Sequence, residues 1–370
     1  MRSRKKFSEG YRDPARVKQV ASTIGELSQS FDEIKIIHLC GTHEYSIVKN
    51  GLRSLLPKNV KLIPGPGCPV CVTPAGHIDA AVELTLSGVE ILTFGDMFKV
   101  PGSKQSLEEA KADGGRVEIV YGLADAISIA QNNTDRNFVF FAIGFETTSC
   151  TTAAEVYKDR IPENLTLLVS HRLMPPITEV VVGMGNLPFL GLLCPGHVST
   201  IIGAKPWRIF PEAYQMPTVV AGFEPLDILT AIRTILEQAR NGEAELVNEY
   251  KRAVRSNGNT KAKEFLKKVF KKTDGHWRGI GTVPSSAYEL REEFKNYDAA
   301  ERYGLHLDMG EDIKPGCRCH HVIIGRAVPT ECPMFLEECT PSSPFGPCMV
   351  SSEGACSVWA KHGGSIDASA

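Results

Sequence analysis

The sequence predicts an α/β protein with two similar parallel-sheet domains facing a cleft and a smaller C-terminal domain of helices and loops. Apolar, β-branched runs alternate with helical patterns over roughly the first 240 residues, as a parallel sheet requires. The starts of the first four runs recur about 100 residues later, which indicates a structural repeat. After that the pattern changes, and six of the 11 cysteines gather near the C-terminal end.

The expected strands follow from these apolar runs, which occupy residues 34–39, 60–63, 89–94, 117–121, 137–143, 165–169, 190–193 and 218–223. Taking four runs per domain predicts a first α/β domain over 15–122 and a repeat-related second domain over 123–240. Residues 226–240 carry apolar positions at helical spacing and stop at Asn241-Gly242, a helix terminator. Residues 241–370 form the predicted third domain.

The composition is that of an ordinary globular protein. The chain of 370 residues has a formal net charge of −2, so neither nucleic acid nor an anionic membrane is expected as the main partner. No apolar stretch approaches the roughly 20 residues that span a bilayer, and no apolar core follows the basic N-terminus as in a secretory signal. A cytoplasmic location is therefore expected, where clustered cysteines more often bind metal or do redox chemistry than form structural disulfides.

Polar and thiol side chains follow the predicted strands. In open parallel sheets, ligands bind beyond the carboxyl ends of the strands. Cys40-Gly41-Thr42-His43-Glu44 follows the first run, and the second leads into a Gly-Pro-rich stretch that ends in Cys68-Pro69-Val70-Cys71. Gly144-Phe145-Glu146-Thr147-Thr148 follows the fifth run. Two facing domains would bring these loops to a shared cleft.

Four of the terminal cysteines are spaced C-x14-C-x6-C-x16-C, at Cys317, Cys332, Cys339 and Cys356. An iron–sulfur cluster needs about four thiolates on loops free to wrap it, and the intervening Gly-Pro-rich sequence supplies such loops. A zinc site also takes four cysteines but commonly uses tight C-x2–4-C pairs, which are absent here. Two further cysteines, Cys319 and Cys348, are alternative ligands, redox-active thiols or buried small hydrophobic residues.

The pair Cys68 and Cys71 forms a C-x-x-C beside a strand end, which is a dithiol or disulfide candidate because the sulfurs can meet in one tight turn. The alternative is half of a zinc knuckle, but the sequence contains no second C-x2-C.

Cys40 is predicted at a strand tip near a helix start, where backbone N–H groups favour a thiolate that could bind a soft metal. His43 could add a ligand or hold a proton, with Glu44 beside it. A buried structural role for Cys40 is also open, and His38 is interpreted as an ordinary core histidine.

Glu146 occupies the matching loop of the predicted second domain and would lie across the cleft from Cys40. It could position a ligand, take a proton or cap its helix. His171 and His197 are weaker cleft candidates. Cys150 and Cys194 lack metal-like spacing and are predicted to be buried thiols.

Four blocks together resemble the signature sequences of the HypD family of hydrogenase maturation factors. They are Cys-Gly-Thr-His-Glu at 40–44, Gly-Pro-Gly-Cys-Pro-Val-Cys at 65–71, Gly-Phe-Glu-Thr-Thr at 144–148, and Cys-Met-Val-Ser-Ser-Glu-Gly-Ala-Cys at 348–356. The resemblance extends over nearly the whole chain, in the family's order. The tail after Cys356, Ser-Val-Trp-Ala-Lys-His, is less aromatic than is typical of the family.

The resemblance implies two α/β domains and a smaller domain that holds a [4Fe–4S] cluster. It implies a monomer when alone, a complex with the small chaperone HypC, and a transient iron that receives two cyanides and one carbon monoxide. HypE, which delivers cyanide made from a HypF-derived carbamoyl group, would dock on that complex. Cys40 would be an iron ligand shared with the chaperone's N-terminal cysteine. Cys68 and Cys71 would be the redox-active pair, and the cluster would relay electrons.

Transfer of cyanide from a thiocyanate-like donor requires two electrons, which a dithiol supplied by a cluster could deliver. A [4Fe–4S]-dependent thiol–disulfide oxidoreductase that acts on a protein disulfide is the alternative, and it requires no role for Cys40. A zinc-stabilised interaction module without redox function is a third interpretation. No Walker-type phosphate-binding motif occurs in the sequence.

Overall fold

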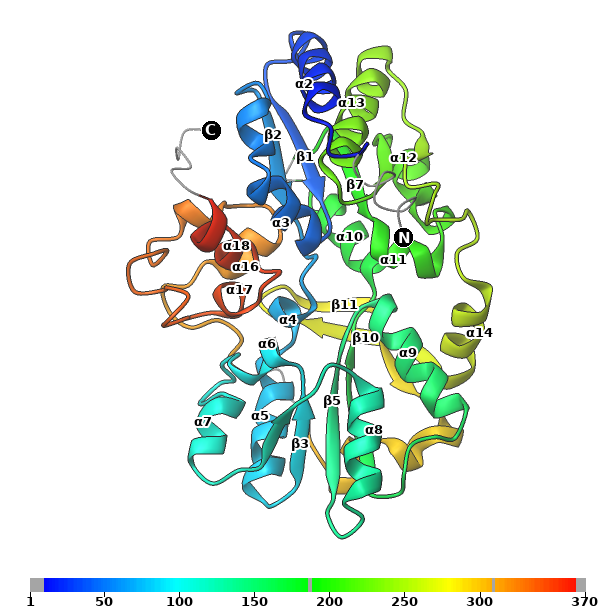
Figure 1. The fold of residues 1–370 in the computed structure, drawn as a ribbon, viewed down its shortest axis with the longest axis vertical. Coiled ribbons are helices and arrows are strands. Elements are labelled where there is room, and N and C mark those ends of the chain that lie inside the picture. The colour runs from blue at the N-terminus through cyan, green and yellow to red at the C-terminus, as the bar shows by residue number, and fades with distance from the viewer. Residues whose placement is uncertain (1–9, 186–187, 308–309, 364–370) are drawn as a thin grey trace.

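The computed structural model describes residues 10–185, 188–307 and 310–363. It contains two parallel sheets in separate lobes, an antiparallel hairpin between them and a C-terminal segment packed at their side (Figure 1). The predicted α/β class with two parallel sheets is confirmed. Residues 1–9, which begin the basic N-terminus, and residues 364–370, which end the predicted third domain, lie outside the described parts of the chain.

The upper lobe in Figure 1 contains a five-stranded sheet in which all strands are parallel. Its order is β2 (Val60–Pro64), β1 (Ile34–His38), β7 (Gly191–Pro195), β8 (Thr218–Ala221) and β9 (Leu246–Asn248). The core strands are continuous apolar runs because helices cover both faces of such a sheet. His38 pairs in register with Pro64 on one side and Leu193 on the other, so the carboxyl ends of these strands form one edge.

The lower lobe contains a four-stranded parallel sheet. Its order is β4 (Val117–Ile119), β3 (Glu90–Thr93), β5 (Phe138–Gly144) and β6 (Leu165–His171). Counted within each sheet, the strand order is 2-1-3-4 in both lobes, and the upper sheet adds a fifth strand. Each sheet therefore has a topological switch point, between β1 and β7 above and between β3 and β5 below, where ligands of such sheets bind.

The predicted domain boundaries group the strands wrongly. The first four strands do not share a sheet: β1 and β2 pair with β7, β8 and β9, whereas β3 to β6 form the other sheet. The chain crosses between lobes after β2 and again after β6. The starts of apolar runs can recur after about 100 residues in a regular α/β chain, because this spacing depends on the lengths of the strand–helix units. It does not show which strands pair.

The helices begin at ordinary capping signals. Asp13 accepts hydrogen bonds from the backbone N–H groups of Ala15 and Arg16 and so starts α2 (Pro14–Ser28), which packs on α13 (Pro225–Asn241). Gly242, in the left-handed region, ends α13 as predicted from Asn241-Gly242. The upper lobe also contains α3 (Gly41–Lys49), η1 (Leu52–Leu55), α11 (Gly196–Ile202), η2 (Lys205–Arg208) and α12 (Ile209–Tyr214).

The lower lobe and the two connections after β2 and β6 contain a further set of helices. Those of the lower lobe are α5 (Ala75–Leu86), α6 (Gly95–Phe98), α7 (Leu107–Ala112), α8 (Leu123–Asn132) and α9 (Glu146–Tyr157). The crossings that follow β2 and β6 run through α4 (Pro69–Val72) and α10 (Met174–Gly183).

Residues after 241 do not form one separate domain. Strand β9 joins the upper sheet, and α14 (Thr260–Val269) packs on α9 of the lower lobe. The hairpin of β10 (Phe270–Trp277) and β11 (Gly281–Leu290) packs on α10 and β6. The predicted boundary at 241 is therefore wrong, because these segments bury their apolar faces against both lobes.

The cysteine-rich part follows η3 (Glu292–Tyr297) and α15 (Ala299–Tyr303). It consists of short elements joined by loops: α16 (Cys319–Ile323), η4 (Pro329–Glu331), α17 (Pro347–Val350) and α18 (Ala355–His362). Within it, α17 contacts α4 and α18 contacts α3, so this segment lies against the carboxyl edge of the upper sheet (Figure 1).

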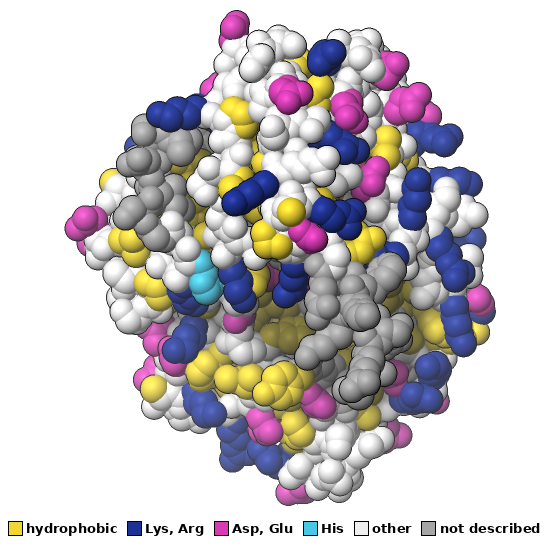
Figure 2. All heavy atoms as spheres, turned by 45° about the horizontal axis from the view of Figure 1, so that its top comes forward, with side chains coloured by type: hydrophobic (Ala, Val, Ile, Leu, Met, Phe, Trp, Pro, Cys, Tyr) yellow, Lys and Arg dark blue, Asp and Glu magenta, His cyan; other side chains and the backbone are white. Residues whose placement is uncertain are grey.

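The surface is of mixed character. Positive and negative side chains are both spread over the face in Figure 2, which is hollowed near its centre over a hydrophobic floor. Among the described helices, none is both long enough and apolar enough to cross a membrane.

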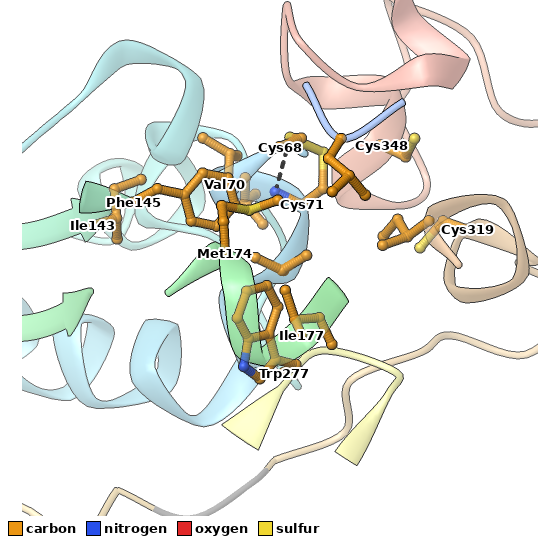
Figure 3. Close-up of a cluster of buried hydrophobic side chains, with 14 of the residues drawn as sticks. Cys68, Val70, Cys71, Ile143, Phe145, Met174, Ile177, Trp277, Cys319 and Cys348 are labelled. Atoms are coloured by element: carbon orange, nitrogen blue, oxygen red, sulfur yellow. Dashed lines mark hydrogen bonds between the residues drawn. A yellow bond between two sulfur atoms is a disulfide. The ribbon is translucent and has the colours of Figure 1, made fainter. Parts of the chain in front are cut away.

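One continuous core joins the two lobes to the C-terminal segment. It includes Ile37 of β1, Phe141 of β5 and Cys348 of α17. Trp277 and Phe145 both belong to this core (Figure 3), and their rings stack at 6.0 Å between centroids. The indole N–H of Trp277 donates to Ser286 Oγ at 2.7 Å. This core fixes the C-x-x-C helix α4 relative to both lobes.

We predict that Trp277→Ala lowers the free energy of unfolding by about 3–5 kcal/mol, because Trp277 is fully buried and its loss leaves a cavity. Urea unfolding followed by circular dichroism measures the change. The control is Tyr121→Ala, whose side chain is 97% exposed and whose loss should change stability by no more than about 0.5 kcal/mol. A Trp277 variant as stable as the control would contradict this account of the core.

Candidate functional site

Cys40 lies where β1 ends and α3 begins, at the switch point of the upper sheet. Its backbone is extended and packs directly on Gly67: Gly41 N–H donates to the Gly67 carbonyl at 3.2 Å. A Cβ at position 67 would lie 2.4 Å from Cys40 N, so only glycine permits this approach. The close contact places the loop that carries Cys68 beside Cys40.

Cys68 and Cys71 form a disulfide across α4, with a Cα–Cα distance of 5.3 Å (Figure 3). Cys68 is the N-cap residue, and its Sγ accepts the backbone N–H of Cys71 at 3.1 Å. Pro69 occupies the first turn, where its fixed φ suits a helix start. The two sulfurs thus meet in one turn, as the C-x-x-C spacing suggests.

Cys40, Cys68 and Cys71 line one pocket together. The C-terminal segment contributes to the same pocket through Cys348 and Glu353. The other lining residues are His38, Gly41, Glu44, Pro64, Gly65, Gly67, Val322, Ile323 and Ala355. Sequence reasoning did not include Glu353, although it lies inside the terminal block at 348–356; its place at this pocket depends on tertiary packing.

Glu44, which lines this pocket, is also the centre of a buried polar network. Its carboxylate lies 2.8 Å from His38 Nε2 and 2.9 Å from Arg53 Nη2, and it also accepts the indole N–H of Trp359. Burial raises the pKa of Glu44, but the charges of Arg53 and His38 and their hydrogen bonds outweigh burial, and the pKa falls to about 2. The ionised carboxylate therefore ties α18 to α3.

His38, interpreted from sequence as an ordinary core histidine, is buried but lines the pocket and contacts Glu44. His43 instead points away from the pocket. Its Nε2 lies 2.9 Å from the carbonyl oxygen of Gly222, and burial, followed by the nearby His38, lowers its pKa to about 3. A role for His43 as a ligand or proton carrier beside Cys40 is not supported by this placement.

The thiolate expected at Cys40 is not favoured by its surroundings. Burial, and after it the charge of Glu353, raise the pKa of the Cys40 thiol to about 11. The backbone hydrogen bonds from Thr42 and His43 act in the opposite direction but are weaker. Without a metal the thiol is neutral at pH 7, because burial outweighs the effect of the helix start.

All six C-terminal cysteines line a second pocket. The predicted ligands Cys317, Cys332, Cys339 and Cys356 are joined there by Cys319 and Cys348. Met334, Phe335, Phe345, Gly346 and Met349 complete its lining. Within the described ranges, no three His, Cys, Asp or Glu side chains converge as a site for a single metal ion.

Backbone N–H groups surround the sulfurs of this cysteine pocket. Phe345 N–H donates to Cys339 Sγ at 3.3 Å, and Cys356 N–H donates to Cys348 Sγ at 3.3 Å. A hydrogen bond from the Cys319 side chain is the main cause that lowers the pKa of Cys317 to about 7. A Cβ at Gly346 would lie 2.9 Å from Cys317 Sγ, so the glycine leaves room around the thiols.

Cys348 lines both pockets and so lies between the disulfide and the other terminal cysteines (Figure 3). The carbonyl oxygen of Pro347 is 3.9 Å from Cys71 Sγ. The cysteine pocket and the disulfide are therefore separated by one short helix, α17.

Glu146 is not across from Cys40. It lines a different pocket of about 450 Å³ between α9, α10 and α14, with Lys272 and Tyr288. Its Oε1 accepts the backbone N–H of Met174 at 3.1 Å, and burial raises the pKa of its carboxyl to about 7. The predicted position of Glu146 across from Cys40 is wrong. Glu146 follows β5, which is the third strand of its sheet and corresponds to β7 of the upper sheet, whereas Cys40 follows β1.

The loop that matches Cys40 in the lower sheet is Gly95-Asp96, after β3. Asp96 Oδ2 accepts hydrogen bonds from Ser351 Oγ at 3.1 Å and from Ser352 N–H at 2.8 Å. Asp96 therefore anchors the C-terminal segment, a role that was not predicted from the sequence.

The weaker candidates lie elsewhere. His171 is buried, with its Nε2 3.1 Å from Thr152 Oγ1, and His197 stacks on Phe223. Neither lines the Cys40 pocket. Cys194 is buried as predicted, whereas Cys150 is only partly buried.

The two α/β lobes bring a buried cysteine and a disulfide together at one sheet edge, next to a pocket lined by cysteines. The candidate site of this class of protein is therefore built from thiols. Comparison with known proteins identifies the family. The family model HypD, described as hydrogenase formation hypA family, matches residues 15–363.

Curated relatives agree over the full length. A hydrogenase expression/formation protein of Methanocaldococcus jannaschii is 44% identical over 95% of this chain and 98% of its own. The hydrogenase maturation factor HypD of Azotobacter vinelandii is 40% identical over 97% of each chain. That of Escherichia coli is 38% identical over 96% of this chain and 98% of its own. The chain belongs to the HypD family of hydrogenase maturation factors.

The buried Glu146 carboxyl gives a pH-dependent prediction. Its pKa is about 7 in the folded chain against 4.5 ordinarily, so the folded state holds this proton more tightly than the unfolded state. The free energy of unfolding therefore falls as pH rises from 4.5 through about 7 and then levels off. We expect Glu146→Gln to be more stable than the wild type by about 3 kcal/mol above pH 8 and nearly equal to it below pH 4.5.

Urea unfolding at several pH values tests this expectation, with the exposed Glu163→Gln as the control that should show no such trend. A difference between Glu146→Gln and wild type that stays constant with pH would show that Glu146 does not hold its proton at neutral pH.

Proposed function

We propose that this maturation factor is a scaffold on which the Fe(CN)2CO group of [NiFe]-hydrogenases is assembled, with Cys40 as an iron ligand. The observation that carries the proposal is that Cys40 and the Cys68–Cys71 disulfide line one pocket, while Cys348 connects that pocket to the terminal cysteines. The residues that we propose as metal ligand, two-electron thiol pair and cluster ligands therefore line two neighbouring pockets that share Cys348.

Cys40 has the properties of a ligand that is protected until iron arrives. Its thiol is buried and neutral, so it is a poor nucleophile toward oxidants and other thiols. A bound soft or borderline metal displaces the thiol proton and forms the thiolate ligand. We propose that the chaperone HypC brings its N-terminal cysteine to the same iron, and that the iron is cargo of the complex.

Cys68 and Cys71 supply the electrons for cyanide transfer in this proposal. A thiocyanate-like donor, R–S–C≡N, accepts two electrons and one proton to release cyanide and R–SH. The dithiol gives up two electrons and two protons and forms the disulfide, and the second proton stays with cyanide as HCN until the iron binds it. HypE is the proposed donor, acting on the carbamoyl group that originates from HypF.

The C-terminal cysteines fit a [4Fe–4S] cluster. Cys317, Cys332, Cys339 and Cys356 surround one pocket, are joined by Gly-Pro-rich loops, and lie in a region where backbone N–H groups donate to sulfur. A single zinc ion requires thiolates that converge within about 2.3 Å of one point, and the described residues contain no such group. When bound, the cluster would supply electrons one at a time for reduction of the disulfide.

The alternative is a [4Fe–4S]-dependent thiol–disulfide oxidoreductase. The disulfide itself favours it, since Cys68 and Cys71 are paired and adjacent to the cysteine pocket. That function requires Cys68, Cys71 and the cluster ligands but not Cys40. Variants at Cys40 therefore separate the two functions.

We predict that the complex purified anaerobically with its HypC chaperone shows cyanide and carbon monoxide bands in the infrared, and that Cys40→Ala abolishes them. The matched control is Cys194→Ala, which removes another buried thiol at the end of the neighbouring strand β7 without touching the pocket. Infrared bands of normal intensity in Cys40→Ala, or hydrogenase maturation that continues in cells carrying it, would refute the scaffold function and favour the oxidoreductase.

We further predict about four iron and four sulfide per chain after anaerobic purification, with broad visible absorbance. Cys317→Ala should lose most of both, whereas Cys150→Ala, outside the cysteine pocket, should retain them. Variants at Cys319 and Cys348 decide whether either replaces one of the four ligands. A colourless protein that contains stoichiometric zinc would instead identify an interaction module.

A further inference from the structure

Arg278 is a buried cation in a turn that contacts both Val72, next to Cys71, and His320, next to Cys319. It lies in the turn that joins β10 to β11 and is only 1% exposed. Its backbone N–H donates to the carbonyl of Val72, the residue after Cys71, at 3.0 Å. Burial of a charged side chain is costly, so a buried arginine is normally paired with a carboxylate.

The pairing of Arg278 is incomplete. Its Nε donates to the backbone carbonyl of Asp312 at 2.7 Å, whereas the Asp312 carboxylate accepts the Gly279 N–H at 3.0 Å and lies 2.7 Å from His276 Nε2. Within the described ranges, Nη1 of Arg278 has no hydrogen-bond partner. No carboxylate of the described chain forms an ion pair with the guanidinium, so its positive charge is not neutralised by direct contact.

The groups that attract the charge of Arg278 are two thiols of the cysteine pocket and two carboxylates. They are Cys319, then Asp312, Cys317 and Asp79. Gly279 packs against His320, next to Cys319, and a Cβ there would lie 2.5 Å from His320 Cβ. The turn is thus held directly against the start of α16.

We propose that Arg278 is a positioning residue that sets the reduction potential of the proposed [4Fe–4S] cluster; this inference rests on that cluster. Addition of an electron makes the cluster and its four thiolates more negative. A fixed, buried positive charge nearby stabilises that reduced state more than the oxidised state, since little water screens it. Arg278 therefore raises the potential. Through Val72 it also holds the dithiol segment at a defined place beside the cysteine pocket.

The test is an equilibrium redox titration of the anaerobic, cluster-loaded protein, followed by visible absorbance and by electron paramagnetic resonance of the reduced cluster. At a fixed electrode potential, Arg278→Gln should lower the ratio of reduced to oxidised cluster at least tenfold, which for a one-electron couple is about 59 mV. Arg278→Lys, which keeps the charge, should restore most of the loss. A role limited to holding the turn would not separate Gln from Lys in this way.

Arg318 provides the matched control. It stands between Cys317 and Cys319 in the sequence, yet its side chain is exposed and its Nη1 donates to the Glu331 carbonyl. Water screens a charge at that position, so Arg318→Gln should leave the ratio nearly unchanged. Asp79→Asn tests for the opposite change. It removes a negative charge that offsets the charge of Arg278, so it should raise the reduced fraction of the cluster.

The outcomes are distinct. Equal reduction potentials in wild type, Arg278→Gln and Arg278→Lys, with full iron and sulfide, would overturn the role of Arg278 while the cluster stands. Should Arg278→Gln fail to load iron, Asp79→Asn still decides, because an unchanged or lowered reduced fraction in that variant contradicts the inference. A wild-type protein without iron and sulfide would instead refute the cluster itself.

Discussion

The contact between Gly67 and the backbone of Cys40 is the constraint on which the site depends. A side chain at position 67 would overlap Cys40, and one at Gly41 would overlap Glu353, whose Cβ would be 2.5 Å away. Three segments distant in sequence therefore pack backbone to backbone: the end of β1, the loop after β2 and the C-terminal block. The end of β1 carries the buried Cys40, the loop after β2 carries the disulfide, and the C-terminal block forms part of the cysteine-lined pocket. Glycine is required because the approach is closer than any Cβ allows. The ionised Glu44, which lines the pocket, contacts His38 of β1 and accepts a hydrogen bond from Trp359 of α18, so it holds two of these segments together.

The topology explains why this packing occurs at these residues. Both sheets have the order 2-1-3-4, so their switch points are equivalent, and the loops after β1 and β3 occupy equivalent positions. One of these loops carries Cys40, and the other carries Asp96. Both contact the same short stretch of the C-terminal segment: Thr42 donates to Glu353, and Ser351 and Ser352 donate to Asp96. The segment is therefore anchored to both lobes at the place where α/β proteins of this kind bind ligands.

Much of this architecture could be predicted from sequence, but its pairing could not. All eight predicted strands occur within one or two residues of the apolar runs, because buried parallel strands must be continuously apolar, whereas β9, β10 and β11 were not predicted. The cysteine groups were also evident, since C-x-x-C and the long terminal spacing are local features. Strand pairing is not local. The assignment of Glu146 to the Cys40 cleft failed because it assumed that β5 repeats β1, whereas β3 does. The thiolate expected at Cys40 failed for a different reason: sequence shows that a helix starts there, but it does not show how much of the thiol is removed from water.

The arrangement also limits how the two thiol centres could move relative to each other. Cys348 and Cys356 lie on either side of residues 351–353, which contact Asp96 and Gly41. Both cysteines line the terminal pocket. Any displacement of that pocket must therefore break contacts with both lobes at once, or separate the lobes. The hydrophobic core points the same way, since it runs without interruption from Ile37 of the upper sheet through Phe141 of the lower sheet to Cys348. A rigid spacing between the disulfide and the terminal thiols suits the electron transfer that we propose between them. The fold provides that spacing because the C-terminal segment contacts the loops at equivalent edges of two similar sheets.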